Sequence, residues 1–214
     1  MTKKERAKLA VEQLKLLYPE AVCSLEYEKP HELLIATRLS AQCTDARVNI
    51  VVKDLFREFP SIDSFADADV HKIEEIIRPC GLFKTKARDI KTMCNQLREN
   101  YNYRVPDTIE ELTKLSGVGR KTANLIVGDI YGKPAVVTDT HCIRICGRLG
   151  LVSSKEPLKV EKELRAILEP EESNAFCHRL VHFGRDVCSA RSPKCEGCPL
   201  SDICKEYSKK APKN

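Results

Sequence analysis

Apolar residues recur with the period of an α-helix along nearly the whole chain. Their spacings of three and four residues place them on one face of a helix. The clearest stripes are Ala7, Val11, Leu14 and Tyr18; Val48, Val52, Leu55 and Phe59; Ala87, Ile90, Cys94 and Leu97; Val160, Leu164, Ile167 and Leu168; and Phe176, Leu180, Phe183 and Val187. Strand-like alternation is essentially missing, and the one candidate, 134–137, is too short to count. The pattern predicts an all-α protein.

Proline and glycine fall between these stripes, where helices should end. Examples are Pro19, Pro30, Pro60, Pro106, Pro157 and Pro170. The intervals predict helices of roughly two to four turns with short connections, as in a compact bundle. The last residues, Ser208 to Asn214, read as a frayed basic tail.

Composition narrows the class of protein. Of 214 residues, 31% are charged and 42% hydrophobic, which is typical of a globular chain. The first ten residues open an amphipathic helix rather than a signal peptide, and no stretch approaches the ~20 apolar residues of a membrane span. We expect a soluble, cytoplasmic protein. Its net charge of +5 favours nucleic acid only weakly.

Eleven cysteines are many for a chain without a secretion signal, so metal ligation is a better explanation than disulfides. Four of them crowd the C-terminal region with intervals of six, two and five residues: Cys188, Cys195, Cys198 and Cys204. Thiolates are the ligands that soft metal centres select. The spacing leaves a four-cysteine zinc site and an iron–sulfur cluster equally open. For the other seven cysteines we expect small buried thiols.

A glycine turn lies between two helical patterns, in the segment 115–123. Gly117 and Gly119 flank Val118, so the backbone amides there are unobstructed at a helix N-terminus, which favours a phosphate. Arg120 and Lys121 add positive charge. An ordinary helix–helix connection is the alternative, but the pattern favours a helix-hairpin-helix that grips the DNA backbone.

Lys121 and Asp139 are the candidates for chemistry. On a helical wheel Lys121 lies opposite the apolar stripe and shares its side with Asn124 and Gly128, so it points toward solvent or a cleft. A solvated surface lysine is the usual meaning of that position. Asp139 is placed to cap the next helix, and its alternative role is a carboxylate facing Lys121.

Taken together, these motifs resemble the endonuclease III family over nearly the whole chain. The segments that carry the resemblance occur in one order: 39–45 (LSAQCTD), 81–87 (GLFKTKA), 115–123 (LSGVGRKTA), 138–141 (TDTH) and the four C-terminal cysteines. Each segment alone is moderately specific, and their combination is highly specific.

The resemblance implies a fold and a cofactor. The fold has two helical lobes flanking a DNA-binding cleft: a bundle of residues 22–133 with the helix-hairpin-helix at about 108–131, and a lobe of 1–21 plus 134–214. The cofactor is a mainly structural [4Fe-4S] cluster, held by Cys188, Cys195, Cys198 and Cys204. It shapes the loop from Ser189 to Lys194, in which Arg191 and Lys194 would meet phosphate.

The resemblance also implies a reaction on double-stranded DNA that contains damaged pyrimidines or abasic sites. Lys121 matches the family's nucleophile and Asp139 its essential carboxylate. A Schiff base on the sugar would release the base, and β-elimination would then cut the strand on its 3′ side. Gln42 and Leu82 match the positions that fill the gap left by the extruded base; a core leucine is the equal alternative for Leu82. The enzyme would be a monomer.

Four departures from the family pattern stand out: Ser116 for a proline, Thr138 for a valine, Lys84 for an asparagine, and Arg38 within the apolar run 33–39. None removes a group that the reaction uses. Lys121 argues against the adenine-glycosylase branch, which typically lacks it. Mismatch-specific thymine removal stays possible as a side activity. A non-catalytic DNA-binding scaffold would require neither Lys121 nor Asp139.

Overall fold

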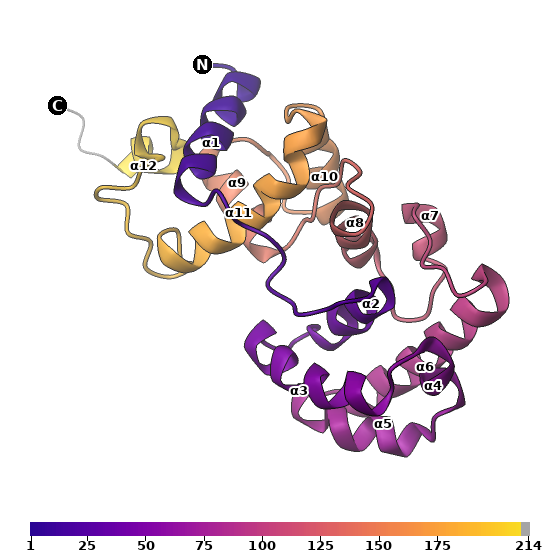
Figure 1. Ribbon diagram of the computed structural model, residues 1–214. Helices are drawn as coiled ribbons and strands as arrows, with labels where there is room; N and C mark the ends of the chain where they lie inside the picture. Colours follow the sequence, from indigo (N-terminus) through magenta and orange to yellow (C-terminus); the bar gives the residue numbers. More distant parts are fainter. Residues whose placement is uncertain (211–214) are drawn as a thin grey trace. The chain divides into compact units, whose positions relative to one another are not determined.

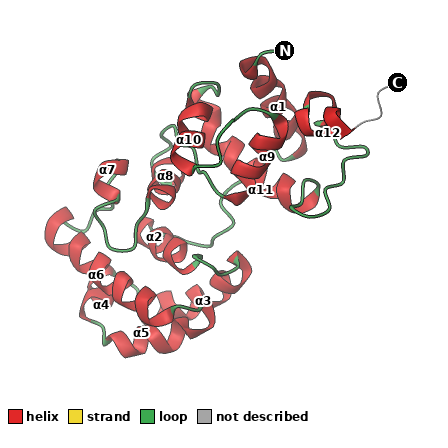
Figure 2. Ribbon diagram, turned by 180° about the vertical axis from the view of Figure 1, so that it is seen from behind, coloured by secondary structure: helices red, strands yellow, loops and turns green. Residues whose placement is uncertain are grey.

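The computed structural model describes residues 1–210, and all regular structure in that range is helical (Figures 1 and 2). No strand occurs among these residues, so the expected all-α class is confirmed. The segment 134–137 is an extended loop whose last three residues are buried. None of the described helices combines the length and the apolar character that a membrane span needs.

The chain divides into two compact units, Met1–Val22 with Gly132–Asn214, and Cys23–Tyr131. The helices of the second unit are α2 (Pro30–Leu39), α3 (Asp45–Glu58), α4 (Ile62–Asp67), α5 (Val70–Ile77), the short 3₁₀ helix η1 (Arg78–Cys80), α6 (Phe83–Tyr101), α7 (Ile109–Leu112) and α8 (Arg120–Asp129).

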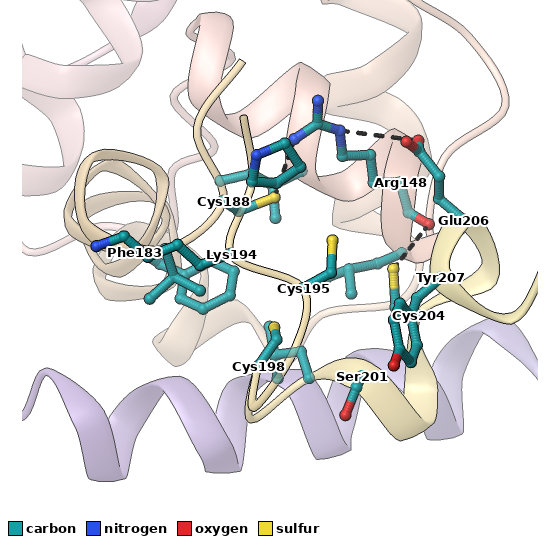
Figure 3. Close-up of a pocket in the computed structure, with 15 residues that line it drawn as sticks. Arg148, Phe183, Cys188, Lys194, Cys195, Cys198, Ser201, Cys204, Glu206 and Tyr207 are labelled. Carbon is teal, nitrogen blue, oxygen red and sulfur yellow. Dashed lines mark hydrogen bonds and ion pairs between the residues drawn. The ribbon is translucent and has the colours of Figure 1, made fainter. Parts of the chain in front are cut away.

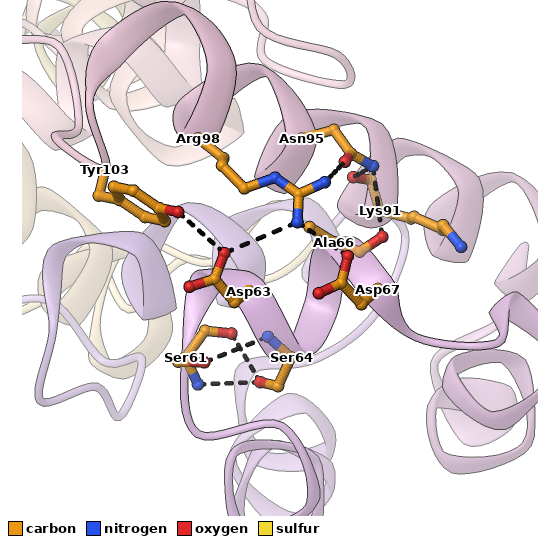
Figure 4. Close-up of polar contacts among 9 residues, drawn as sticks. All are labelled: Ser61, Asp63, Ser64, Ala66, Asp67, Lys91, Asn95, Arg98 and Tyr103. Atoms are coloured by element: carbon orange, nitrogen blue, oxygen red, sulfur yellow. Dashed lines mark hydrogen bonds and ion pairs between the residues drawn. The ribbon is translucent and has the colours of Figure 1, made fainter.

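Helix α6 is central to this unit and contacts α2, α4 and α5. Its predicted apolar stripe is fully buried at Ala87, Ile90, Cys94 and Leu97. Polar contacts close the edge of the packing against α4. Arg98 donates to Asp67 at 2.8 Å and lies 3.6 Å from Asp63, while the Tyr103 hydroxyl donates to Asp63 at 3.1 Å (Figure 4).

The first unit contains α1 (Lys3–Leu17), α9 (Thr140–Leu149), α10 (Pro157–Arg165), η2 (Pro170–Glu172), α11 (Ser173–Asp186), η3 (Ser201–Ile203) and α12 (Lys205–Lys210). Helix α11 packs against α1 and α9 and buries Phe176, Leu180 and Phe183. Helix α12 corrects one expectation, because Ser208 is helical rather than part of a frayed tail. The hydroxyl of Ser208 donates to the Lys205 carbonyl, as local polar contacts in a helix do. The rest of that tail, 211–214, lies outside the described residues.

Candidate active site and cluster site

The glycine turn lies between α7 and α8 and has an open helix N-terminus. Gly117 has a φ of 74°, a left-handed conformation that favours glycine. Val118 is buried, and its N–H donates to the Leu115 carbonyl at 3.1 Å. Gly119 is the N-cap of α8 and offers no side-chain acceptor. The amides of the first turn of α8 are therefore not capped by a side chain at Gly119, which suits an anion.

A polar network from α2 and α6 supports this turn. Arg38 forms an ion pair with Asp89 at 2.7 Å, and both side chains are largely shielded from solvent. Ser116 completes the network, because its hydroxyl donates to Asp89 at 3.1 Å and its N–H donates to Gln96 at 2.8 Å. A proline at position 116 would have no N–H to donate. Two departures from the family pattern, at 38 and 116, are thus parts of one network.

Gly117 has no room for a side chain beside this network. A Cβ atom there would lie 2.8 Å from the side chain of Arg38 and 3.0 Å from Asp89. The close approach and the positive φ together require glycine. Sequence reasoning interpreted Arg38 as an interruption of an apolar face and missed that it packs under the turn.

Lys121 is exposed in the first turn of α8, on the side opposite the buried residues Ala123, Ile126 and Val127. The structure gives its ammonium no hydrogen-bond or ion-pair partner among the described residues. Asn124 shares that side on the helical wheel but is buried, with its side chain only 1% exposed. Helix α8 contacts both α2 and α7, so its buried surface is wider than the apolar stripe.

Asp139 is the N-cap of α9. Its Oδ1 atom accepts a hydrogen bond of 2.6 Å from the Cys142 N–H, which confirms the capping role. The cap uses one carboxylate oxygen and leaves the second for other contacts. Asp139 and Lys121 belong to different units, so their pairing stays a prediction.

Gln42 and Leu82 share an unusual backbone conformation. Their φ angles are 56° and 49°, and both side chains are exposed, Leu82 to 56%. This exposure excludes the alternative of a core leucine. Left-handed non-glycine residues cost about 1–2 kcal/mol each, and such strain clusters at functional sites. The other two such residues in the described range, Asn102 and Tyr103, simply end α6.

The four C-terminal cysteines line one pocket between α9, α11 and the C-terminal loop (Figure 3). Burial raises the pKa of the Cys198 thiol, and the neighbouring thiols of Cys188, Cys204 and Cys195 raise it further, while a hydrogen bond from the Leu200 backbone lowers it. Four thiolates in this position therefore need a positively charged centre among them.

The pocket offers four cysteine sulfurs, which are the donors that hold a [4Fe-4S] cluster, so the chemistry of the site fits that cofactor. A four-cysteine zinc site would use the same donors. Between residues 188 and 209 only Leu200 is buried, so this segment has almost no apolar core of its own.

Two arginines of α9 hold the loop that starts at Cys188. Arg148 donates to the Cys188 sulfur at 3.3 Å and to the carbonyls of Ser189 and Ala190 at 2.7 and 2.9 Å. Arg144 donates to the Cys188 carbonyl at 2.9 Å. Sequence reasoning missed both, although their spacing of four residues puts them on one helix face.

Comparison with known proteins defines the class of protein to which this chain belongs. Residues 35–170 match the family of HhH-GPD superfamily base excision DNA repair proteins, and residues 188–204 match the iron-sulfur binding domain of endonuclease III.

Relatives of known name narrow this class. The chain is 42% identical to Endonuclease III of Synechocystis sp., over 95% of this chain and 93% of that protein, and 40% identical to Endonuclease III of Bacillus subtilis, over 91% and 89%. A solved structure of a trapped Endonuclease III–DNA covalent intermediate superimposes with a TM-score of 0.92 at 42% identity, covering 98% of this chain and 99% of that one.

The chain belongs to the endonuclease III family, as the resemblance of its motifs predicted. Its cofactor is a [4Fe-4S] cluster, which decides between the two metal sites that the cysteine spacing left open. The structure also shows the thiols that fit such a cluster, gathered in one pocket.

Proposed function

We propose that this chain is a bifunctional DNA glycosylase and abasic-site lyase of base excision repair, which removes oxidised pyrimidines from duplex DNA. The observation that carries the proposal is the exposed primary amine of Lys121. This lysine is the second residue of α8, a helix whose N-cap, Gly119, has no side chain to cap it. A solved relative at 42% identity is a trapped Endonuclease III–DNA covalent intermediate, which supports covalent chemistry here.

The reaction follows from the chemistry of an amine. The damaged nucleotide leaves the base stack, because its glycosidic carbon is unreachable inside the duplex. The neutral amine of Lys121 attacks C1′, the C1′–base bond breaks, and the base leaves with its electron pair and takes up a proton. The attached nitrogen then loses a proton, the C1′–O4′ bond breaks as O4′ is protonated, and the opened sugar is held as a Schiff base. Loss of a C2′ proton from this Schiff base expels the 3′ phosphate from C3′, which is β-elimination. Asp139 stabilises the positive charge on the sugar and moves protons.

We assign the DNA contacts to residues from both units. The turn residues Gly117, Val118, Gly119 and Arg120 bind the phosphate backbone. Gln42 and Leu82 occupy the gap left by the extruded base, for which their exposed, strained positions are suited. Arg191 and Lys194, both exposed on the loop after Cys188, add phosphate contacts.

The cluster ligands in this proposal are Cys188, Cys195, Cys198 and Cys204. When bound, the cluster crosslinks a segment that has little apolar core, and it supplies no step of the reaction. The unit Cys23–Tyr131 carries the nucleophile and the other unit carries Asp139 and the cluster. The enzyme acts as a monomer in the cytoplasm, on the DNA of the nucleoid.

Borohydride trapping tests the nucleophile. Reduction should link the protein covalently to duplex DNA that contains thymine glycol or an abasic site. Lys121→Gln should abolish the adduct and strand cleavage but retain DNA binding, because the substitution removes only the amine. The measurement is the yield of the adduct on a denaturing gel, together with binding by anisotropy.

A matched control shows whether trapping depends on Lys121 or on any exposed lysine. Lys72 is also exposed on a helix of the same unit, so Lys72→Gln should trap as well as the wild type. Persistence of the adduct in Lys121→Gln would refute the assignment. A wild-type protein that binds DNA without trapping or base release would favour the non-catalytic scaffold.

A further inference from the structure

Lys86 of α6 is a fully buried lysine whose ammonium bonds only to backbone carbonyls. Its side chain has no exposed surface. The Nζ atom donates to the carbonyls of Leu39, Ala41 and Cys80 at 2.8, 2.8 and 2.9 Å. An ammonium has three N–H donors, so these bonds use its full capacity. No ion pair accompanies them among the residues that the structure describes.

The three carbonyls come from two segments that are far apart in the sequence. Leu39 ends α2, and Ala41 contributes the peptide group that joins it to Gln42. Cys80 ends η1, two residues before Leu82. The Lys86 backbone also belongs to this arrangement, because its N–H donates to the Leu82 carbonyl at 3.0 Å. One residue thus holds both segments that carry the exposed side chains at 42 and 82.

The thiols of Cys43 and Cys80 are consistent with this arrangement. Cys43 directly follows Gln42, and its thiol helps to raise the pKa of Cys80, to about 11, after burial as the larger cause. Burial lowers the pKa of Lys86, which these two thiols offset in part. Burying a cation costs free energy, and the three hydrogen bonds to carbonyls offset that cost at this position.

The geometry points to Lys86 as a positioning residue for base extrusion, which fixes Gln42 and Leu82 in their left-handed conformations before DNA arrives. This inference rests on the proposed function, in which those two side chains replace the extruded base. Two strained residues keep such a conformation only where their surroundings determine it fully. If Gln42 and Leu82 are already held in place, no conformational entropy is lost in ordering them when the duplex opens.

The test uses Lys86→Met in the full chain with its cluster. Methionine retains the bulk of the side chain and removes all three hydrogen bonds. Single-turnover release of thymine glycol from paired duplex should slow by roughly tenfold to a hundredfold, as expected from misplaced groups near the reaction. The fluorescence gain of 2-aminopurine beside a tetrahydrofuran abasic analogue, which reports unstacking, should fall in parallel.

Two further experiments distinguish a positioning role of Lys86 from a general contribution to stability. With mismatched pairs flanking the lesion the cost of unstacking is small, so the defect of Lys86→Met should shrink. In a Gln42→Ala, Leu82→Ala background the same substitution should have little additional effect on release, because its targets are already gone. A merely structural role would produce the same loss in every arm.

Lys91→Met is the matched control. Lys91 lies on the same helix and donates one hydrogen bond of 2.6 Å to the carbonyl of Ala68, a residue outside 39–42 and 80–82. Its release rate should match the wild type. If Lys86→Met does not fold, as judged by circular dichroism and cluster absorbance, Lys86→Gln provides the second variant. It should show a smaller but measurable defect, because two amide donors can still meet two of the three carbonyls.

The outcomes separate cleanly. Equal release rates and equal 2-aminopurine signals for the wild type and the folded Lys86 variant overturn the inference alone, and so does a defect that persists unchanged with mismatched flanks. A wild type that releases no base from any lesion overturns the proposed function, and the inference falls with it.

Discussion

At the scale of single residues, Asp139 combines two roles that one substitution can separate. It caps α9 through Oδ1, and the proposed reaction needs its negative charge. Asparagine caps a helix as well as aspartate does, because its amide oxygen accepts the same hydrogen bond. Asp139→Asn should therefore fold normally and lose at least about a hundredfold in single-turnover base release, the range of general acid–base contributions.

Asp139→Ala is the comparison for that experiment, since it removes the cap together with the charge. It should lower the free energy of unfolding by about 1 kcal/mol, measured by chemical denaturation, while Asp139→Asn should not. Base release at the wild-type rate by Asp139→Asn would leave Asp139 as a cap and nothing more.

Residue types were predictable from the sequence more readily than backbone conformations. The motif identified Gln42 and Leu82 as candidates, but it left Leu82 equally balanced between a wedge and a core residue. Its exposure excludes the core role and leaves the wedge as a prediction, and both its exposure and its positive φ depend on how η1 and α6 meet. A three-carbonyl site for Lys86 also follows from tertiary structure, because its acceptors come from α2, from the turn after it and from η1.

At the scale of helices, the apolar period located the elements well and described their surroundings less well. The stripe of α6 is buried as expected. The stripe of α8 underestimates its buried face, because both α2 and α7 contact this helix and Asn124 is buried as well. Arg38 looked like an interruption, since its partner Asp89 lies on another helix, 51 residues further along.

The network of Arg38, Asp89 and Ser116 gives a prediction for the helix-hairpin-helix. Asp89→Ala should lower the free energy of unfolding by about 1–3 kcal/mol, because it leaves a shielded guanidinium without its partner beside Gly117. DNA binding should weaken as well, because the turn loses its support. Thermal melting and anisotropy with undamaged duplex measure the two effects.

A double-mutant cycle provides the control for this network. In Arg38→Ala, Asp89→Ala the second substitution should cost less than it does alone, with a coupling of about 0.5–3 kcal/mol. Strictly additive effects would show that the ion pair does not support the turn.

At the scale of the whole molecule, the cluster compensates for a missing core. Between residues 188 and 209 only Leu200 is buried, so apolar burial cannot order this segment. Cys198→Ser should abolish the broad absorbance near ~400 nm that thiolate-bound iron gives. The loop 189–194 should then become sensitive to protease, while the helices of Cys23–Tyr131 persist.

The unaffected unit serves as the internal control. Limited proteolysis followed by mass spectrometry should recover fragments of Cys23–Tyr131 from Cys198→Ser, and Cys94→Ser, a buried thiol outside the cluster pocket, should retain the absorbance. Stoichiometric zinc in a colourless, active wild type would contradict the iron–sulfur assignment.

The order of the cysteines in the sequence was sufficient to find this site, because short intervals keep ligands close together. The sequence also suggested a carboxylate facing Lys121 as one role of Asp139, but its spacing could not show that the two residues meet, and the resemblance assigned them to one reaction.

The shared lysine also limits how this protein can change in length. An inserted or deleted residue in either 39–42 or 80–82 would pull a carbonyl away from the Lys86 ammonium, which serves both segments at once. Neither loop can therefore be exchanged alone. A graft intended to alter the range of lesions should transplant both segments together with Lys86, which bonds to both of them.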